Sequence, residues 1–161
     1  MRTLLLAGSL LVAAPLAAQS DIPAPPVRDS IVAVVKQLFD GMRAHDSTMI
    51  RSAFVEGAVM MGPAPQPGRP QVVQFSSIDG FVGAAGRPGV PWDEQIFDPE
   101  IRIDGGLATM WIFYTFHAGE RFSHCGYDAL FLVRTEAGWK IAAIADTRRQ
   151  EGCDTAGKEK V

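Results

Sequence analysis

The stretch from Trp92 to Arg148 alternates between apolar and polar residues with a period of two, and this restricts it to an antiparallel sheet. Three turn sequences divide the stretch: DGG at 104–106, AGE at 118–120 and EAG at 136–138. Glycine-containing turns between period-two segments are typical of β-hairpins. We therefore expect a four-stranded meander with strands near 93–104, 107–118, 121–134 and 138–148.

The residues ahead of the meander show helical spacing instead. Apolar residues from 31 to 42 recur every three or four positions, which predicts an amphipathic helix capped by Asp29 or Ser30. Asp46 or Ser47 caps a second short helix, 57–62 is a short strand, and 76–86 is a third helix. Four prolines within 63–71 favour a loop there. Helices followed by a meander indicate an α+β fold, with the N-terminal helices packed in the concave face of a strongly curved antiparallel sheet.

Residues 1–18 have the layout of a secretory signal peptide. Arg2 precedes an apolar run from Leu4 to Val12, and small residues follow. The run is too short to span a bilayer, so we expect an exported protein, periplasmic or extracellular, with no membrane contact after cleavage. We expect an extended lead-in over 19–29, because it holds three closely spaced prolines. One domain then covers 30–153, and a disordered tail covers 154–161.

The composition of the chain argues against one class of binding partner. Hydrophobic residues make up 47% of the 161 residues, which is enough for one domain with a core. The 15 basic and 18 acidic residues give a net charge of -3 without any basic run. Phosphate binding needs clustered Lys and Arg, so we exclude nucleic acid as a partner.

Export changes the interpretation of the two cysteines, Cys125 and Cys153. An oxidising compartment favours a disulfide between them, closing a loop of about 28 residues. The alternative is a nucleophilic cysteine with His124 as its base. Neighbouring residues of a strand point to opposite faces of the sheet, which argues against that pair.

Pairing the strands from their turns, without bulges, defines two faces of the sheet. One face then carries Trp111, Phe113, Thr115, His124, Gly126, Asp128, Leu130, Leu132, Trp139, Ile141 and Ala143. The other carries Met110, Ile112, Tyr114, Cys125, Tyr127, Phe131, Val133, Lys140, Ile144, Asp146 and Arg148. Lys140 suggests that the second face points outward. That face is largely apolar, so we expect a homodimer through it. A bulge, for example at Gly126, would shift this register and exchange the faces beyond it.

Several short motifs resemble a known group. The order of elements, together with FVGAAG, HCGYDALFLV, GWKIAAIADTRR and the late GC, is similar to the nuclear transport factor 2-like superfamily, over roughly 30–153. These motifs resemble in particular its bacterial putative lumazine-binding branch. The resemblance implies a cone-shaped α+β fold with a cavity. The superfamily includes isomerases, dehydratases, hydrolases and non-catalytic domains, so the resemblance implies no single activity.

The candidate site residues lie around Gly126, where the missing side chain leaves a gap. We expect Trp111, Thr115, His124 and Asp128 to form a cavity wall, with Tyr114 among the aromatic residues able to stack on a ligand. Four residues along a strand span roughly 13 Å, which is too far for a direct hydrogen bond between His124 and Asp128. Structural hydrogen bonding is the alternative role for both residues. Asp146 and Arg148 form either an outer ion pair or, if the register slips by one, a second pocket carboxylate and an anion clamp.

Three functions remain open at this point. The first is binding of an unknown small, partly apolar molecule in the cavity. The second is an isomerase, dehydratase or hydrolase that uses His124 and a cavity carboxylate, Asp128 or Asp146. The third is a scaffold with a filled core. We expect no cofactor and no metal, because His117, His124, Cys125 and Asp146 are split between the faces and lack ligand spacing.

Overall fold

The computed structural model describes residues 25–66 and 69–161, so the predicted signal peptide lies outside the described residues. The chain forms three helices and six strands in the order α1 (Pro25–Ala44), α2 (Ser47–Ser52), β1 (Phe54–Gln66), β2 (Arg69–Ser76), α3 (Ile78–Ala85), β3 (Trp92–Asp104), β4 (Leu107–Ala118), β5 (Arg121–Thr135) and β6 (Gly138–Asp146). The four strands expected after Trp92 are therefore confirmed. No helix in this part of the chain is long and apolar enough to cross a membrane.

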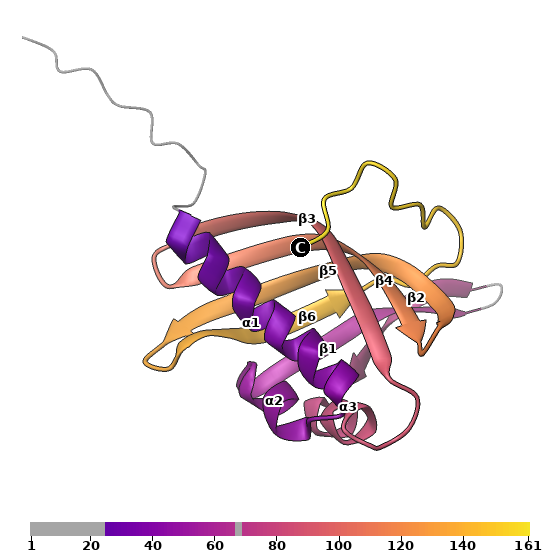
Figure 1. The fold of residues 1–161 in the computed structure, drawn as a ribbon, viewed down its shortest axis with the longest axis horizontal. Helices are drawn as coiled ribbons and strands as arrows, with labels where there is room; N and C mark the ends of the chain where they lie inside the picture. Colours follow the sequence, from indigo (N-terminus) through magenta and orange to yellow (C-terminus); the bar gives the residue numbers. More distant parts are fainter. Residues whose placement is uncertain (1–24, 67–68) are drawn as a thin grey trace, which may run out of the picture.

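The six strands form one curved sheet in the order β2-β1-β6-β5-β4-β3. β1 runs parallel to β6, and the other neighbouring strands are antiparallel. Figure 1 shows α1 lying across the concave face of the sheet, with α2 and α3 gathered near one end. This arrangement confirms the predicted α+β fold with helices packed in the concave face.

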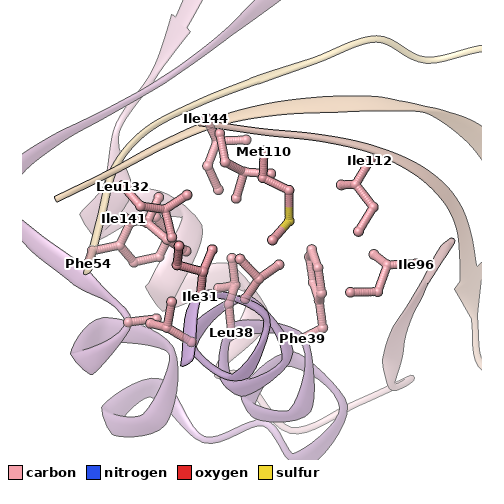
Figure 2. Packing of buried hydrophobic residues seen from close by; sticks show 14 of the residues in the cluster. Ile31, Leu38, Phe39, Phe54, Ile96, Met110, Ile112, Leu132, Ile141 and Ile144 are labelled. Atoms are coloured by element: carbon pink, nitrogen blue, oxygen red, sulfur yellow. The ribbon is translucent and has the colours of Figure 1, made fainter. Parts of the chain in front are cut away.

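The apolar stripe of α1 anchors the helix to the sheet. Its buried members, Ile31, Val35, Leu38 and Met42, are at most 2% exposed. Figure 2 shows Ile31 and Leu38 directed toward side chains of the sheet, among them Met110, Leu132, Ile141 and Ile144. Full burial of one such side chain contributes about 1.5–3 kcal/mol, so this stripe alone holds α1 firmly in place.

The first helix begins earlier than the sequence indicates. It starts at Pro25, five residues before the expected cap at Ser30, so the predicted extended lead-in is wrong from that point. Prolines are tolerated in the first turn of a helix, where the backbone N–H groups have no partner within the helix. The prolines therefore mark the start of α1 and do not prevent it.

The prediction of a loop over the proline-rich stretch 63–71 is also wrong. Residues 63–66 and 69–71 belong to the paired strands β1 and β2 and not to a loop, and Pro63 lies opposite Val73. The pairing of β1 with β6 ends at Met61, so Pro63 lies where β1 has a single partner strand. A missing N–H is tolerated in such a position.

Cys125 and Cys153 form the expected disulfide, but the tail that follows is ordered. The Asp98 N–H donates to the Glu159 carbonyl at 3.0 Å, and the Glu159 N–H donates to Asp98 Oδ1 at 2.8 Å. Asp98 lies in a bulge of β3 with a φ of 50°, which leaves its backbone and carboxylate free for these bonds. The tail therefore covers an edge strand that would otherwise be open.

Two bulges change the register expected for the meander. Ser123 is extra in β5, so His124 lies opposite Phe116 and not Thr115. Ala142 is extra in β6, so Asp128 lies opposite Asp146 and not Ala145. Directly opposite residues point to the same face, and the bulges therefore exchange the predicted faces of β4 and of the end of β6.

The end of β6 approaches β5 very closely at Gly126. A Cβ at this position would lie 1.8 Å from the Thr147 carbonyl oxygen and 3.0 Å from the Tyr114 ring. The Tyr114 hydroxyl donates to the same carbonyl at 2.8 Å. The gap expected at Gly126 is therefore filled by backbone, and this contact positions Asp146 and Arg148 on either side of it.

We expect Gly126→Ala to lower the free energy of unfolding by at least about 2 kcal/mol, because the methyl group forces the Thr147 carbonyl away from β5. Gly83→Ala is the matched control, since a Cβ at Gly83 in α3 meets nothing within 4 Å. That variant should be neutral or slightly more stable, because alanine favours a helix. Urea unfolding of both variants measures the difference, and equal stability would contradict the packing described.

Candidate functional site

A cavity of about 840 Å³ lies between the concave face of the sheet, α1 and α3. Its apolar lining comes from all of these elements, including Leu38 and Met42 of α1 and Phe81 of α3. The polar lining residues lie on the strands or next to them: Gln74, Ser76, Ser77, Glu94, Tyr114, Arg121, Ser123, His124, Asp128, Asp146 and Arg148. The cavity is thus lined by both apolar and polar side chains, and its charged groups come from β3, β5, β6 and the residues just after β6.

Two rows of opposite residues organise this wall. Glu94, Phe116 and His124 lie across β3, β4 and β5, with the Phe116 and His124 rings stacked at 5.0 Å between centroids. Asp128 and Asp146 lie opposite each other on β5 and β6. Side chains in such rows point the same way, so the strand register itself brings three carboxyl groups to one region of the cavity.

The carboxyl groups of Glu94 and Asp128 share a hydrogen bond. Asp128 is only 3% exposed. Burial, followed by the charge and the hydrogen bond of Asp128, raises the pKa of Glu94 well above its usual range. Burial also raises the pKa of Asp128 to about 7, with the charge of Asp146 adding to the effect. Two carboxylates this close cannot both ionise easily, so the pair retains one proton near neutral pH.

Asp146 and Arg148 form an ion pair at the cavity mouth. Arg148 Nε donates to Asp146 Oδ2 at 2.7 Å, while the Arg148 side chain remains 67% exposed. Burial lowers the pKa of Arg148, but the hydrogen bond and the charge of Asp146 outweigh this, so the guanidinium stays charged. The pair is therefore internally neutral, and the outer edge of the guanidinium faces solvent.

His124 and Tyr114 complete the polar wall. His124 Nδ1 lies 3.0 Å from Ser123 Oγ, which leaves Nε2 available to the cavity. Burial, followed by the charge of Arg148, lowers the pKa of His124, so its ring is neutral at pH 7. Burial and the charges of Asp128 and Glu94 raise the pKa of Tyr114 far above its usual range. Both side chains thus face the cavity as neutral hydrogen-bonding groups.

The sequence-predicted site residues fall into two groups. Tyr114, His124, Asp128, Asp146 and Arg148 all line the cavity, which is the slipped-register alternative for the last two. The prediction that Trp111 and Thr115 line the cavity is wrong, because the bulge at Ser123 directs both side chains to the outer face. There Trp111 stacks on Tyr127 with ring centroids 4.9 Å apart, and Thr115 lies opposite Cys125.

The sequence interpretation missed Glu94. The signal was present, because Glu94 lies between Trp92 and Ile96 in a period-two strand and so shares their face. A charged residue in an apolar row is a candidate for a buried functional group. Its partner Asp128 is 34 residues away in the sequence, and only the sheet register brings the two together.

The described residues, 25–66 and 69–161, contain no group of three or more His, Cys, Asp and Glu side chains arranged to hold a metal ion.

Comparison with known proteins identifies the fold. No family model matches the sequence, and no curated protein matches it. Solved structures do. A nuclear transport factor 2-like protein of unknown function from Shewanella baltica has 21% sequence identity and a TM-score of 0.61, covering 77% of this chain and 94% of that chain. A nuclear transport factor 2-like protein from Cytophaga hutchinsonii has 13% identity and a TM-score of 0.61, covering 76% of this chain and 98% of that chain.

A third structure, a nuclear transport factor 2-like protein with a cystatin-like fold from Novosphingobium aromaticivorans, has 13% identity and a TM-score of 0.60. It covers 79% of this chain and 84% of that chain. The chain therefore has the nuclear transport factor 2-like fold that its motifs imply. The more specific resemblance to the lumazine-binding branch stays a prediction.

The raised pKa of Asp128 predicts a specific pH dependence of stability. The folded protein binds this proton with a pKa of about 7, against 3.8 for an ordinary Asp, so the group favours folding at low pH. Its contribution is lost as the pH rises from about 4 to about 7, at a cost on the order of a few kcal/mol. Relative to wild type, Asp128→Asn should therefore gain stability over this range in urea unfolding.

The exposed Asp104 supplies the control for that experiment. Asp104→Asn removes an exposed carboxylate at the end of β3, and its pH profile should run parallel to that of the wild type. If the pH dependence of the unfolding free energy of Asp128→Asn also ran parallel to that of the wild type, the pair would hold no extra proton.

Proposed function

We propose that the protein binds a small, partly apolar molecule in the cavity between α1, α3 and the concave face of the sheet. The observation that carries this proposal is the wall itself: a proton-sharing carboxyl pair faces an open, aromatic-lined space of about 840 Å³. A scaffold domain would fill such a space with side chains. An open cavity therefore supports a ligand.

The size and lining of the cavity fit a small organic ligand. Binding sites for such molecules commonly have volumes of about 300–1,000 Å³, an apolar lining and a few converging polar groups. Here the rings of Phe81, Trp92 and Phe116 form a continuous series, with centroids 6.4 Å and 5.9 Å apart. Flat or aliphatic parts of a ligand would pack against these rings, while the carboxyl pair would orient its polar end.

Acid–base catalysis is the second candidate, and the pKa of Asp128 favours it. A group that titrates near 7 can both accept and donate a proton at physiological pH. His124 Nε2 would hydrogen-bond to a second position of the substrate. The test is to measure the mass of a bound ligand before and after incubation with the wild type and with Asp128→Asn. If neither protein changes the mass of the ligand, the result argues for binding without catalysis.

Export is also part of the proposal. The disulfide between Cys125 and Cys153 supports it, because such bonds persist in oxidising compartments. N-terminal sequencing of the protein recovered outside the cytoplasm tests the cleavage expected near Ala18. An intact N-terminus on that protein would contradict it.

Filling the cavity tests the binding site directly. Gln74 lines the cavity from β2, and its neighbour Val73 does not line it and is 63% exposed. We expect Gln74→Trp to weaken binding of a neutral apolar probe, 1-naphthalenemethanol, at least tenfold, because the indole occupies the space. Val73→Trp adds the same side chain outside the cavity and should leave the affinity within twofold. Fluorescence titration measures both, and equal affinities would place the probe elsewhere.

A homodimer through the outer face of the sheet remains a proposal as well. Trp111, Leu107 and Phe131 on β4 and β5 are 45–50% exposed and form an apolar surface there. We expect the non-reduced protein to sediment as a dimer and Trp111→Lys to sediment as a monomer. Phe75→Lys alters an exposed apolar residue of β2 and should remain dimeric. A monomeric wild type at micromolar concentration would contradict the dimer.

A further inference from the structure

Three carboxyl groups, Glu94, Asp128 and Asp146, line the cavity around the guanidinium of Arg148, which acts on all three but hydrogen-bonds only to Asp146. Above pH 7, where Asp128 ionises and Glu94 keeps its proton, the two carboxyl groups together hold one negative charge. In the described residues, no Arg or Lys side chain hydrogen-bonds to either carboxyl group: Arg148 is bonded to Asp146, and Arg43 of α1 to Asp40 and Asp93. Arg43 reaches Glu94 only at its backbone carbonyl, at 3.3 Å.

Burial makes this imbalance costly. A buried charge without a partner is strongly destabilising, and the cost is removed when a group of opposite sign is placed against it. An anionic ligand would add repulsion, and a neutral ligand would leave the charge unbalanced. A cationic ligand is the one charge class that the inner end of the cavity stabilises.

The aromatic lining favours the same class. Phe116 lies directly opposite Glu94 in the sheet, and Trp92 lies two residues before Glu94 on the same face of β3. Trp92 in turn contacts Phe81 of α3. Ring faces attract ammonium groups by about 0.5–2 kcal/mol, and more strongly where water is excluded.

We propose that the cavity takes an amphipathic organic cation, a molecule with an aromatic or aliphatic body and a protonated amine that donates hydrogen bonds to Glu94 and Asp128. This inference rests on the proposed function, since it names the ligand class of the same site. The ammonium displaces the protons of the pair and leaves both carboxylates ionised against it. Binding therefore releases about one proton above pH 7, where only Glu94 is protonated, and up to two below pH 7, where Asp128 is protonated as well.

Other charged groups around the pair change the pH at which it ionises, but they leave the net charge of this region negative. Those facing it are Asp146 and Arg148 after the bulge in β6, His124 on β5 and Tyr114 on β4, while α1 and α3 contribute apolar side chains to the cavity. Asp146 and Arg148 neutralise each other, and His124 and Tyr114 are uncharged at pH 7. Arg121 lies exposed at the rim, where solvent screens it.

Three probes with one ring system separate the charge classes: 1-naphthylmethylamine, 1-naphthalenemethanol and 1-naphthoate. At pH 8 we expect the amine to bind at least tenfold more tightly than the alcohol, and the naphthoate to bind more weakly than the alcohol. Between pH 7 and pH 5 the affinity for the amine should fall by about tenfold to a hundredfold per pH unit, because up to two protons compete for the pair. Calorimetry at pH 6.5 in two buffers of different ionisation enthalpy should show proton release for the amine alone.

Variants assign the effect to the carboxyl pair. Glu94→Gln should weaken binding of the amine at least tenfold and lower the number of protons released by about one, while the affinity for the alcohol stays within twofold. Glu100→Gln, an exposed position on the same strand, is the matched control and should behave as wild type. Asp128→Asn provides a second test of the pair should Glu94→Gln fail to fold.

The outcomes separate this inference from the proposed function. If the alcohol binds and Gln74→Trp displaces it, but the amine binds no more tightly, the cavity is a binding site and the inference of a cationic ligand is wrong. An amine affinity unchanged in both Glu94→Gln and Asp128→Asn overturns the inference as well. If none of the three probes binds, the proposed function fails and the inference fails with it.

Discussion

The close contact between Gly126 and the Thr147 carbonyl is the feature on which the rest of the site depends. Because Gly126 has no side chain, the chain after β6 can lie against β5, where the Tyr114 hydroxyl donates to the same carbonyl. Asp146 and Arg148 flank this point and reach the cavity. Without that approach, the cavity would lose the ion pair of Asp146 and Arg148. Asp128 would also lose the neighbouring carboxylate that helps to raise its pKa.

Stability and function draw on different parts of the structure. The apolar stripe of α1 and the inner side chains of the sheet form the core, and the disulfide with the ordered tail secures the outer face and the edge of β3. The carboxyl pair is placed beside this core at a cost in stability near neutral pH, because its ionisation is opposed by burial. The retention of such a pair in an open cavity supports the proposal that the cavity binds a ligand.

The fold was predictable to a large extent because its signals are local. Tight turns containing Gly105, Gly119 and Gly138 divide the meander, and these three residues adopt positive φ values as hairpin turns require. The site was predictable only in part. His124 and Asp128 reach the expected face, but Trp111 and Thr115 lie on the other face, because single extra residues at Ser123 and Ala142 shift the register. No local pattern distinguishes a bulged residue from its neighbours, since a bulge depends on the strands that pair with it.

The sequence by itself determined the class of fold, the positions of the four C-terminal strands and the pairing of the two cysteines. Those properties follow from periodicity, turn residues, composition and the number of cysteines. The tertiary structure alone decided which carboxyl groups meet. Glu94 and Asp128 are distant in the sequence, and their hydrogen bond exists only because the bulged register of β3, β4 and β5 aligns them on one wall. Burial then creates the raised pKa values and the unbalanced charge, and burial is a property of the folded chain.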